Sequence, residues 1–109
     1  MQREGKYPPP RGVTDIIGLE CTGEIVDATT LKPTGEKVMA LLAGGGYSEY
    51  VAVQKAHTMP VFFDDWERSA AIPEVWCTAF QLLNLVAKVQ PTETVLIHAA
   101  ASGVGTAML

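Results

Sequence analysis

Residues 94–109 read TVLIHAAASGVGTAML, and this stretch decides what fold the chain has. Val95, Leu96 and Ile97 form a short apolar run with β-branched side chains, which is typical of a strand buried on both faces. The residues from 99 to 105 are small, and residues 106–109 have the pattern of the first turn of a helix. The stretch therefore predicts a strand, a tight turn and the start of a helix.

A strand, a small-residue turn and a helix start together indicate a dinucleotide-binding βα unit. In such a unit the N–H groups at the helix N-terminus face a pyrophosphate, and small side chains let the phosphates approach. The usual pattern G-x-G-x-x-G reads here AASGVG over residues 100–105, so only Gly105 matches and Gly103 is additional. An ordinary tight strand-to-helix turn explains the same letters. A dinucleotide fold needs several βα units, and residues 94–109 supply only the first.

The composition is that of a small globular protein of 109 residues, with 48% hydrophobic residues, 18% charged residues and a net charge of −4. The absence of a basic run argues against nucleic acid or an acidic membrane surface as a partner. No apolar run approaches the roughly 20 residues of a spanning helix, and the polar start does not resemble a signal peptide. Cys21 and Cys77 lie in apolar contexts, which favours reduced thiols and a cytoplasmic location.

The order of elements predicts an all-β part followed by an α/β part, with the change near residue 64. Glycine-rich and turn-rich segments separate the first elements, whereas Asp64 and Asp65 provide an N-cap pair for a helix. We expect strands over residues 16–26, 36–42 and 47–53, and helices over residues 64–72 and 74–86.

Three side chains could carry chemistry, and each also has an ordinary structural explanation. Tyr7 precedes three prolines on a loop, where its ring can stack and its hydroxyl can donate, or the ring can simply cover nearby core. Glu20 is flanked by apolar residues, so its carboxylate is either paired with a cation or turned to solvent. His57 has no second histidine or cysteine at ligand spacing, which favours a surface histidine over a metal ligand.

Four motifs, taken together, carry a family resemblance. They are GLECTG at 18–23, ALLAGGGYSEYVAV at 40–53, AAIPEVWCTAFQLL at 70–83 and VLIHAAASGVGTAML at 95–109. In this order and spacing the chain strongly resembles the quinone oxidoreductases, a branch of the medium-chain dehydrogenase/reductase superfamily. The resemblance covers nearly the whole chain.

The resemblance implies an α+β fragment of a longer fold. Residues 1–72 would be part of a GroES-like catalytic β domain. Residues 73–109 would be a linking helix and the first βα unit of a truncated NADPH-binding Rossmann domain. Members of the branch are cytoplasmic enzymes that reduce a quinone or a similar small electrophile with NADPH, and the full-length form is expected to be a homodimer.

The resemblance also implies roles for six residues. The pyrophosphate of NADPH would rest on Ser102, Gly103, Val104 and Gly105. Thr78 would face the nicotinamide ring, and Tyr7 would lie near the nicotinamide and the quinone. Tyr7 is the one candidate catalytic residue, because its hydroxyl could donate a proton or a hydrogen bond to the reduced oxygen. The hydride transfer itself belongs to the cofactor.

A catalytic zinc site is not expected. Zinc-dependent relatives carry G-H-E where this chain has Gly18-Leu19-Glu20, and the side chain of Leu19 has no lone pair to offer. Near Pro73 they have a cysteine, where this chain has Glu74, and Cys77 stands about a turn further on without partners. A catalytic zinc needs three protein ligands around an open position, so the sequence predicts no metal.

Three interpretations follow from the sequence. The first is an NADPH-dependent quinone reductase, of which the 109 residues alone are not expected to be active. The second is a non-enzymatic truncated isoform that interacts with full-length subunits or is simply unstable. The third is a related chemistry on the same scaffold, the reduction of an enoyl thioester.

Overall fold

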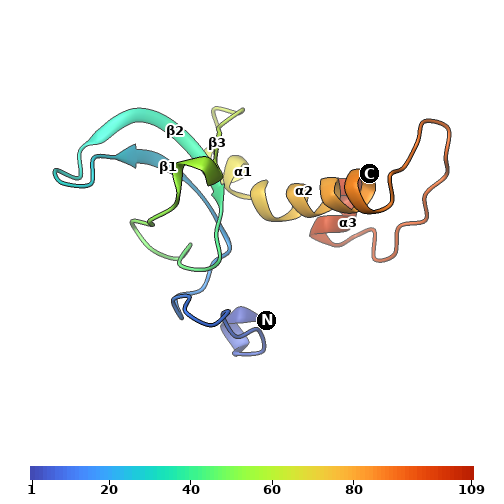
Figure 1. Ribbon diagram of the computed structural model, residues 1–109, viewed down its shortest axis with the longest axis horizontal. Helices are drawn as coiled ribbons and strands as arrows, with labels where there is room; N and C mark the ends of the chain where they lie inside the picture. The colour runs from blue at the N-terminus through green and yellow to red at the C-terminus, as the bar shows by residue number, and fades with distance from the viewer. The chain divides into compact units, whose positions relative to one another are not determined.

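The computed structural model describes all 109 residues, which form two compact units, Met1–Pro73 and Glu74–Leu109 (Figure 1). The first unit holds a three-stranded antiparallel sheet, two short 3₁₀ helices and one short α-helix. The second holds most of a longer helix, a connecting segment and a C-terminal helix. The fold is therefore α+β, as the sequence predicts.

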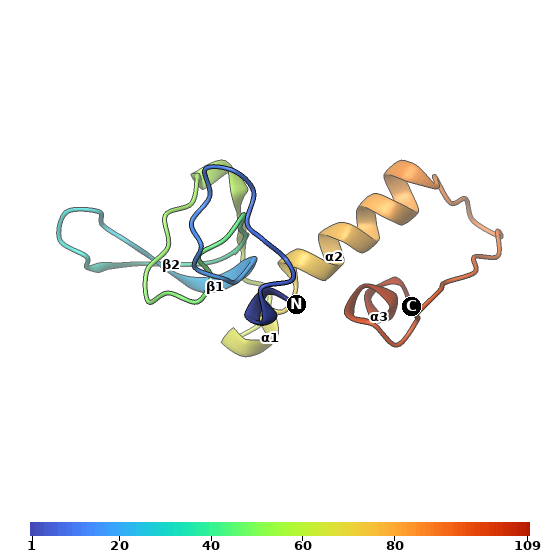
Figure 2. The same cartoon turned by 90° about the horizontal axis from the view of Figure 1, so that it is seen from below.

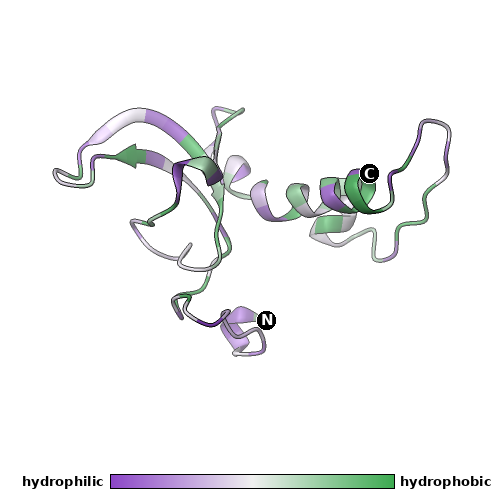
Figure 3. Cartoon of the chain, in the orientation of Figure 1, coloured by the Kyte–Doolittle hydropathy of each residue, from purple (hydrophilic) through white to green (hydrophobic).

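The sheet of the first unit is built from β1 (Glu20–Val26), β2 (Pro33–Leu41) and β3 (Thr58–Pro60), in that order. Its small core lies at the C-terminal end of β2, where Met39 and Ala40 are each 1% exposed. The first part of β2 is exposed, and the strand passes from hydrophilic to hydrophobic residues along its length (Figure 3). The two strands predicted over 16–26 and 36–42 are confirmed, with shifted bounds.

Main-chain contacts continue the β1–β2 pairing beyond the ends of both strands. The N–H of Gly46 donates to the carbonyl of Gly18 at 3.0 Å, and the N–H of Tyr47 donates to that of Ile17 at 2.9 Å. Gly18 has φ +102°, and a Cβ atom there would lie 2.8 Å from the Cα atom of Gly46. Both loops therefore depend on glycine, because one backbone lies directly on the other.

The predicted strand over residues 47–53 is wrong. The segment has no ladder partner, and Tyr47 and Tyr50 are 69% and 59% exposed. Alternation of side chains indicates two faces, but a strand also needs a neighbouring chain to accept its backbone hydrogen bonds. The third strand is instead the short β3, which follows the 3₁₀ helix η2 (Lys55–His57).

The helix α1 (Trp66–Ala70) is shorter than the predicted 64–72 but begins with the expected cap. The carboxylate of Asp65 accepts a hydrogen bond from the N–H of Arg68 at 2.9 Å, which satisfies one of the free donors of the first turn. The ammonium of Lys37, on β2, lies 5.1 Å from the ring centroid of Trp66, and 3.3 Å from the carboxylate of Asp64. These contacts join α1 to the sheet. The N-terminal 3₁₀ helix η1 (Gln2–Glu4) contains Gln2, whose amide oxygen accepts from Gly18.

A longer helix begins at Pro73, where a missing N–H costs nothing. It comprises α2 (Pro73–Phe80) and a π-helical continuation, η3 (Gln81–Val86), which can be followed in Figure 2. The π-helical form is wider than an α-helix, as the hydrogen bond from the N–H of Ala87 to the carbonyl of Leu82, five residues earlier, shows at 2.9 Å. The helix predicted over 74–86 is thus confirmed in extent, while its last six residues take the π form.

The C-terminal helix α3 (Gly103–Met108) starts three residues earlier than the predicted Thr106. The strand predicted at Val95–Ile97 is wrong as a strand of a sheet, because these residues pair with no other segment. An apolar β-branched run becomes a strand only where a neighbouring chain pairs with its backbone. None of the helices combines the length and the apolar character that crossing a membrane requires.

Candidate functional site

The turn before α3 reverses the chain within a few residues. The N–H of Ser102 donates to the carbonyl of Ala99 at 2.8 Å, which closes the turn. Ala99 has φ +52°, in the left-handed region that a residue with a Cβ atom enters only at a cost. The small residues of the motif thus serve a sharp change of direction between residues 98 and 103.

Gly105 is buried in the first turn of α3, directly against the incoming chain. A Cβ atom at this position would lie 2.5 Å from the carbonyl oxygen of Ala99 and 2.6 Å from the Cα atom of Ala100. Both neighbours are backbone atoms, which cannot rotate away. The last glycine of the motif is therefore required by close packing of the helix on the turn, the role that the third glycine has in dinucleotide-binding turns.

Ser102 caps α3. Its hydroxyl oxygen accepts from the N–H of Gly105 at 3.1 Å, and its carbonyl accepts from the N–H of Thr106 at 2.8 Å. The N–H groups of Gly103 and Val104 donate to no other group in the structure. The start of α3 thus offers two unpaired backbone donors beside an exposed serine hydroxyl.

Gly103 lies against the longer helix of the same unit. A Cβ atom at Gly103 would be 3.0 Å from Cγ1 of Val75, a tight contact with a side chain of α2. The additional glycine of the motif is explained by this packing. The sequence gives no sign of it, because Val75 lies 28 residues earlier in the chain.

The six predicted site residues divide between the two units. Ser102, Gly103, Val104 and Gly105 lie together in the capped first turn of α3. Thr78 is a half-buried residue of α2, and its hydroxyl donates to the carbonyl of Glu74 at 2.8 Å. Tyr7 lies in the first unit and is 51% exposed.

Neither thiol is bonded to the other, since Cys21 and Cys77 are both free. Burial raises the pKa of the Cys21 thiol, and a hydrogen bond with the backbone of Ala40 opposes this effect. Cys77 is exposed on α2. No three histidine, cysteine or acidic side chains lie close enough together to hold a metal ion.

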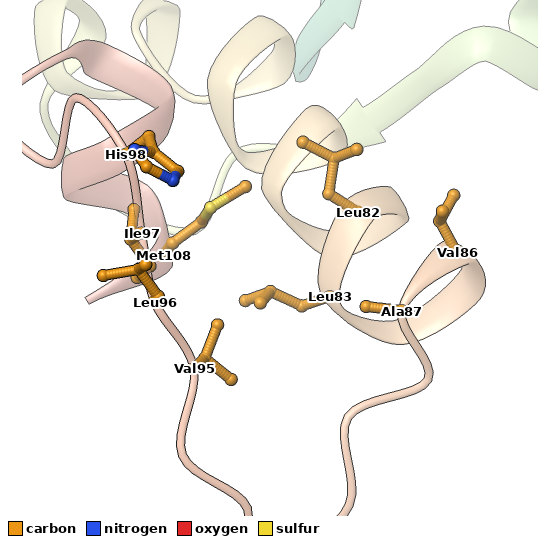
Figure 4. A pocket seen from close by; sticks show the side chains of 9 residues that line it. All are labelled: Leu82, Leu83, Val86, Ala87, Val95, Leu96, Ile97, His98 and Met108. Atoms are coloured by element: carbon orange, nitrogen blue, oxygen red, sulfur yellow. The ribbon is translucent and has the colours of Figure 1, made fainter.

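An open apolar hollow of about 340 Å³ lies within the second unit (Figure 4). The end of the longer helix forms one wall, the segment before the turn forms the other, and Met108 of α3 contributes to the lining. No motif in the sequence indicates this hollow. Its two signals were present, however: the apolar face of the helix and the apolar run at Val95–Ile97.

No family model matches the chain. It is 37% identical over 112 residues to a synaptic vesicle membrane protein VAT-1 homolog of Danio rerio, a match that covers 98% of this chain and 23% of that protein. It is 36% identical over 107 residues to polyketide synthase GfsB of Streptomyces halstedii, covering 94% of this chain and 2% of that protein.

Solved structures are also similar to the chain, and one of them covers most of it. The ER cyclopropanase of CurF, from the curacin A biosynthetic pathway, superimposes with a TM-score of 0.72 and 33% sequence identity, covering 84% of this chain and 29% of that one. The chain thus spans less than a third of each of these three proteins.

Proposed function

Because these similarities relate the chain to the medium-chain dehydrogenase/reductase superfamily, we propose that it forms part of an NADPH-dependent reductase. The observation that carries the proposal is the capped turn at Ser102–Gly105, with its two unpaired N–H groups. Such donors at a helix start suit the oxygens of a pyrophosphate. The identities support this superfamily at the level of sequence, and the structural similarity supports it at the level of fold.

The residues of the turn fit the cofactor. The N–H groups of Gly103 and Val104 would donate to phosphate oxygens, and the hydrogen of the Ser102 hydroxyl remains available, because that hydroxyl uses only a lone pair on Gly105. NADPH, when bound, would supply the hydride. The part of this chain is to bind and orient the phosphates.

The proposal gives Thr78 and Tyr7 positions at the reacting end of the cofactor. The hydroxyl hydrogen of Thr78 is used on the carbonyl of Glu74, so its oxygen would accept from the nicotinamide amide rather than donate to it. The exposed Tyr7 would donate a hydrogen bond or a proton to the oxygen of the reduced substrate. A Tyr7→Phe variant that kept the quinone kcat/KM within about twofold would contradict this role.

For the substrate we propose a quinone or a similar small electrophile, as in the tumour-suppressor-inducible animal quinone oxidoreductases that the chain resembles. A second candidate, reduction of an enoyl thioester, is favoured by the polyketide synthases and the ER cyclopropanase among the similar proteins. Measuring the rate of NADPH oxidation of the full-length protein with a panel of quinones and enoyl thioesters distinguishes these two candidate reactions. Neither chemistry is proposed to use zinc.

The proposal places the protein in the cytoplasm and, in a full-length form, in a homodimer. The 109 residues alone are expected to bind NADPH weakly and to catalyse no turnover, because one turn supplies only some of the contacts that offset the ordering of ligand and protein. A non-enzymatic short form that interacts with full-length subunits is the alternative.

Titration of the purified chain with NADPH, followed by fluorescence and by thermal melting, tests the proposal. Saturable binding with a raised Tm is expected, and Gly105→Ala should abolish it by displacing the turn. Gly23→Ala is the matched control, because a Cβ atom at Gly23 meets nothing within 4 Å. A folded chain that binds no NADPH at millimolar concentration would contradict the proposal and support the non-enzymatic alternative.

A further inference from the structure

Gln2 is the half-buried residue among twelve that are otherwise all exposed, from Met1 to Gly12. Its side-chain amide oxygen accepts a hydrogen bond from the N–H of the buried Gly18 at 3.0 Å. The two residues are 16 positions apart, so this bond closes the chain between them into a loop, and Tyr7 lies on that loop. The side chain of Gln2 therefore attaches the exposed start of the chain to the residues that precede β1.

The residues around Gln2 form a closed turn, which lies beside the letter N in Figure 1. The carbonyl of Met1 accepts from the N–H groups of Glu4 and Lys6, both at 3.1 Å. Tyr7 is the residue that directly follows this turn. Because the turn is held together by its own backbone, a displacement of Gln2 would move the start of the segment that carries Tyr7.

The other partner of the bond, Gly18, is held firmly by its surroundings. Its carbonyl accepts from the N–H of Gly46 at 3.0 Å, and a Cβ atom at Gly18 would lie 2.8 Å from the Cα atom of Gly46. The backbone at Gly18 is thus packed directly on a second backbone, which fixes the direction of its N–H group. The hydrogen bond to Gln2 therefore fixes the N-terminal turn relative to the loops at the end of the sheet.

The segment after Tyr7 is stiff. Three prolines, Pro8–Pro10, follow the tyrosine, and each proline ring locks the φ angle of its residue. A proline-rich segment behaves as a semi-rigid spacer, so its position in space depends mainly on where its ends are attached. The ring of Tyr7 is 51% exposed, and Gln2 provides an attachment on its N-terminal side.

We propose that Gln2 is a positioning residue for Tyr7, an inference that rests on the proposed function, in which the Tyr7 hydroxyl donates to the oxygen of the reduced substrate. By accepting from Gly18, Gln2 keeps the start of the loop in place and so keeps this hydroxyl where it can donate. Gln2 acts through Tyr7 and takes no chemical step itself. Its effect is large because a small displacement of a donor weakens its hydrogen bond and slows the reaction steeply.

Steady-state kinetics of quinone reduction by the full-length protein, at saturating NADPH, test the proposal. Gln2→Met keeps the length of the side chain but replaces the amide oxygen by a thioether, a weak acceptor. It should lower kcat roughly tenfold with little change in KM, because the hydroxyl of Tyr7 contributes in the transition state. Gln2→Glu retains an acceptor oxygen and should keep kcat within about twofold. Arg3→Met makes the same replacement at an exposed neighbour and should leave kcat unchanged.

A double-variant cycle with Tyr7→Phe separates positioning from a general structural effect. Gln2→Met should lower kcat in the unmodified protein but change it by less than about twofold in the Tyr7→Phe background. An equal effect in both backgrounds, or no effect in either, would overturn this inference alone. A Tyr7→Phe variant that itself kept kcat/KM within about twofold would contradict the proposed role of Tyr7 and the inference with it.

Amide hydrogen exchange of the same proteins, measured by NMR, gives a readout that does not depend on turnover. Gln2→Met should accelerate exchange at Gly18, and Gln2→Glu should not, because only the first removes the acceptor of this N–H. Circular dichroism of each variant checks that the fold is retained. Unchanged exchange at Gly18 in Gln2→Met would show that this hydrogen bond does not hold the turn, and would overturn the inference.

Discussion

The carbonyl oxygen of Ala99 lies only 2.5 Å from where a Cβ atom at Gly105 would be. Gly105→Ala should therefore force the turn away from α3 and lower the free energy of unfolding by about 1–3 kcal/mol, the usual cost of overpacking. Urea unfolding followed by circular dichroism measures this change. Gly23→Ala should change it by less than about 1 kcal/mol. If both substitutions changed the free energy of unfolding equally, the close backbone contact at Gly105 would make no particular contribution to stability.

Ala99 should gain from the opposite substitution. Its φ of +52° costs alanine about 1–2 kcal/mol, while glycine loses about 0.5–1 kcal/mol of chain entropy on folding. Ala99→Gly should thus raise the unfolding free energy by up to about 1 kcal/mol. Ala101→Gly, in the same turn but without a positive φ, should lower it. Chemical denaturation of the two variants side by side gives the comparison, and a destabilised Ala99→Gly would contradict the assigned strain.

Asp27 makes the turn between β1 and β2 sensitive to acid. Hydrogen bonds from the N–H and the hydroxyl of Thr30, and from the N–H of Thr29, lower the pKa of this carboxyl below its ordinary value of 3.8. A carboxylate with a lowered pKa stabilises the fold above its unfolded pKa, and this stabilisation is lost as the pH falls through the lower, folded value.

The difference in Tm between the unmodified chain and Asp27→Asn should therefore be constant at neutral pH and should shrink below about pH 4. Thermal melts from pH 7 to pH 2 provide the measurement. A difference that stays constant down to pH 2 would mean that the charge of Asp27 contributes nothing.

The two acidic residues before α1 offer a matched pair. Asp65 caps the helix, so Asp65→Ala should lower the unfolding free energy by about 1 kcal/mol. Asp64 is 98% exposed and contacts Lys37 only at the surface, so Asp64→Ala should cost less than about 0.5 kcal/mol. Urea unfolding of both variants in low salt tests the order, and a larger effect at Asp64 would reverse the assignment of the cap.

Local signals predicted the elements that depend on local chemistry. Asp65 caps α1 through its side chain, as predicted, because aspartate is preferred at this position. Ser102 caps α3 in the same way, but this cap was not predicted, since the helix was expected to begin at Thr106. The two long strands follow from β-branched and apolar patterns, and the break of register between Glu24 and Val26 is the part that no pattern indicated. The grouping of the four residues of the turn was also predictable, because they are consecutive.

Features that depend on distant residues were not predictable from a single sequence. Residues 47–53 alternate between apolar and polar side chains, and residues 95–97 are all apolar, so both segments have the sequence pattern of a strand. No other segment pairs with their backbones, and both predicted strands are therefore wrong. The contact of Gly103 with Val75 forms only when the two helices are packed together, and the apolar hollow of the second unit depends on the same packing. The π-helical form of Gln81–Val86 was also not predictable, because no capping residue or proline in the sequence marks it.

The close backbone contact between Gly18 and Gly46 limits which sequence changes the two loops can accept during evolution. Four hydrogen bonds join residues 42–47 to residues 16–19, and all four connect main-chain atoms. Such bonds do not depend on side-chain identity, so most of these positions are free to drift in sequence. Gain or loss of a single residue in either loop would instead shift every bond at once. We therefore expect the two loops to tolerate most amino-acid substitutions, except at Gly18 and Gly46, and to tolerate insertions and deletions poorly.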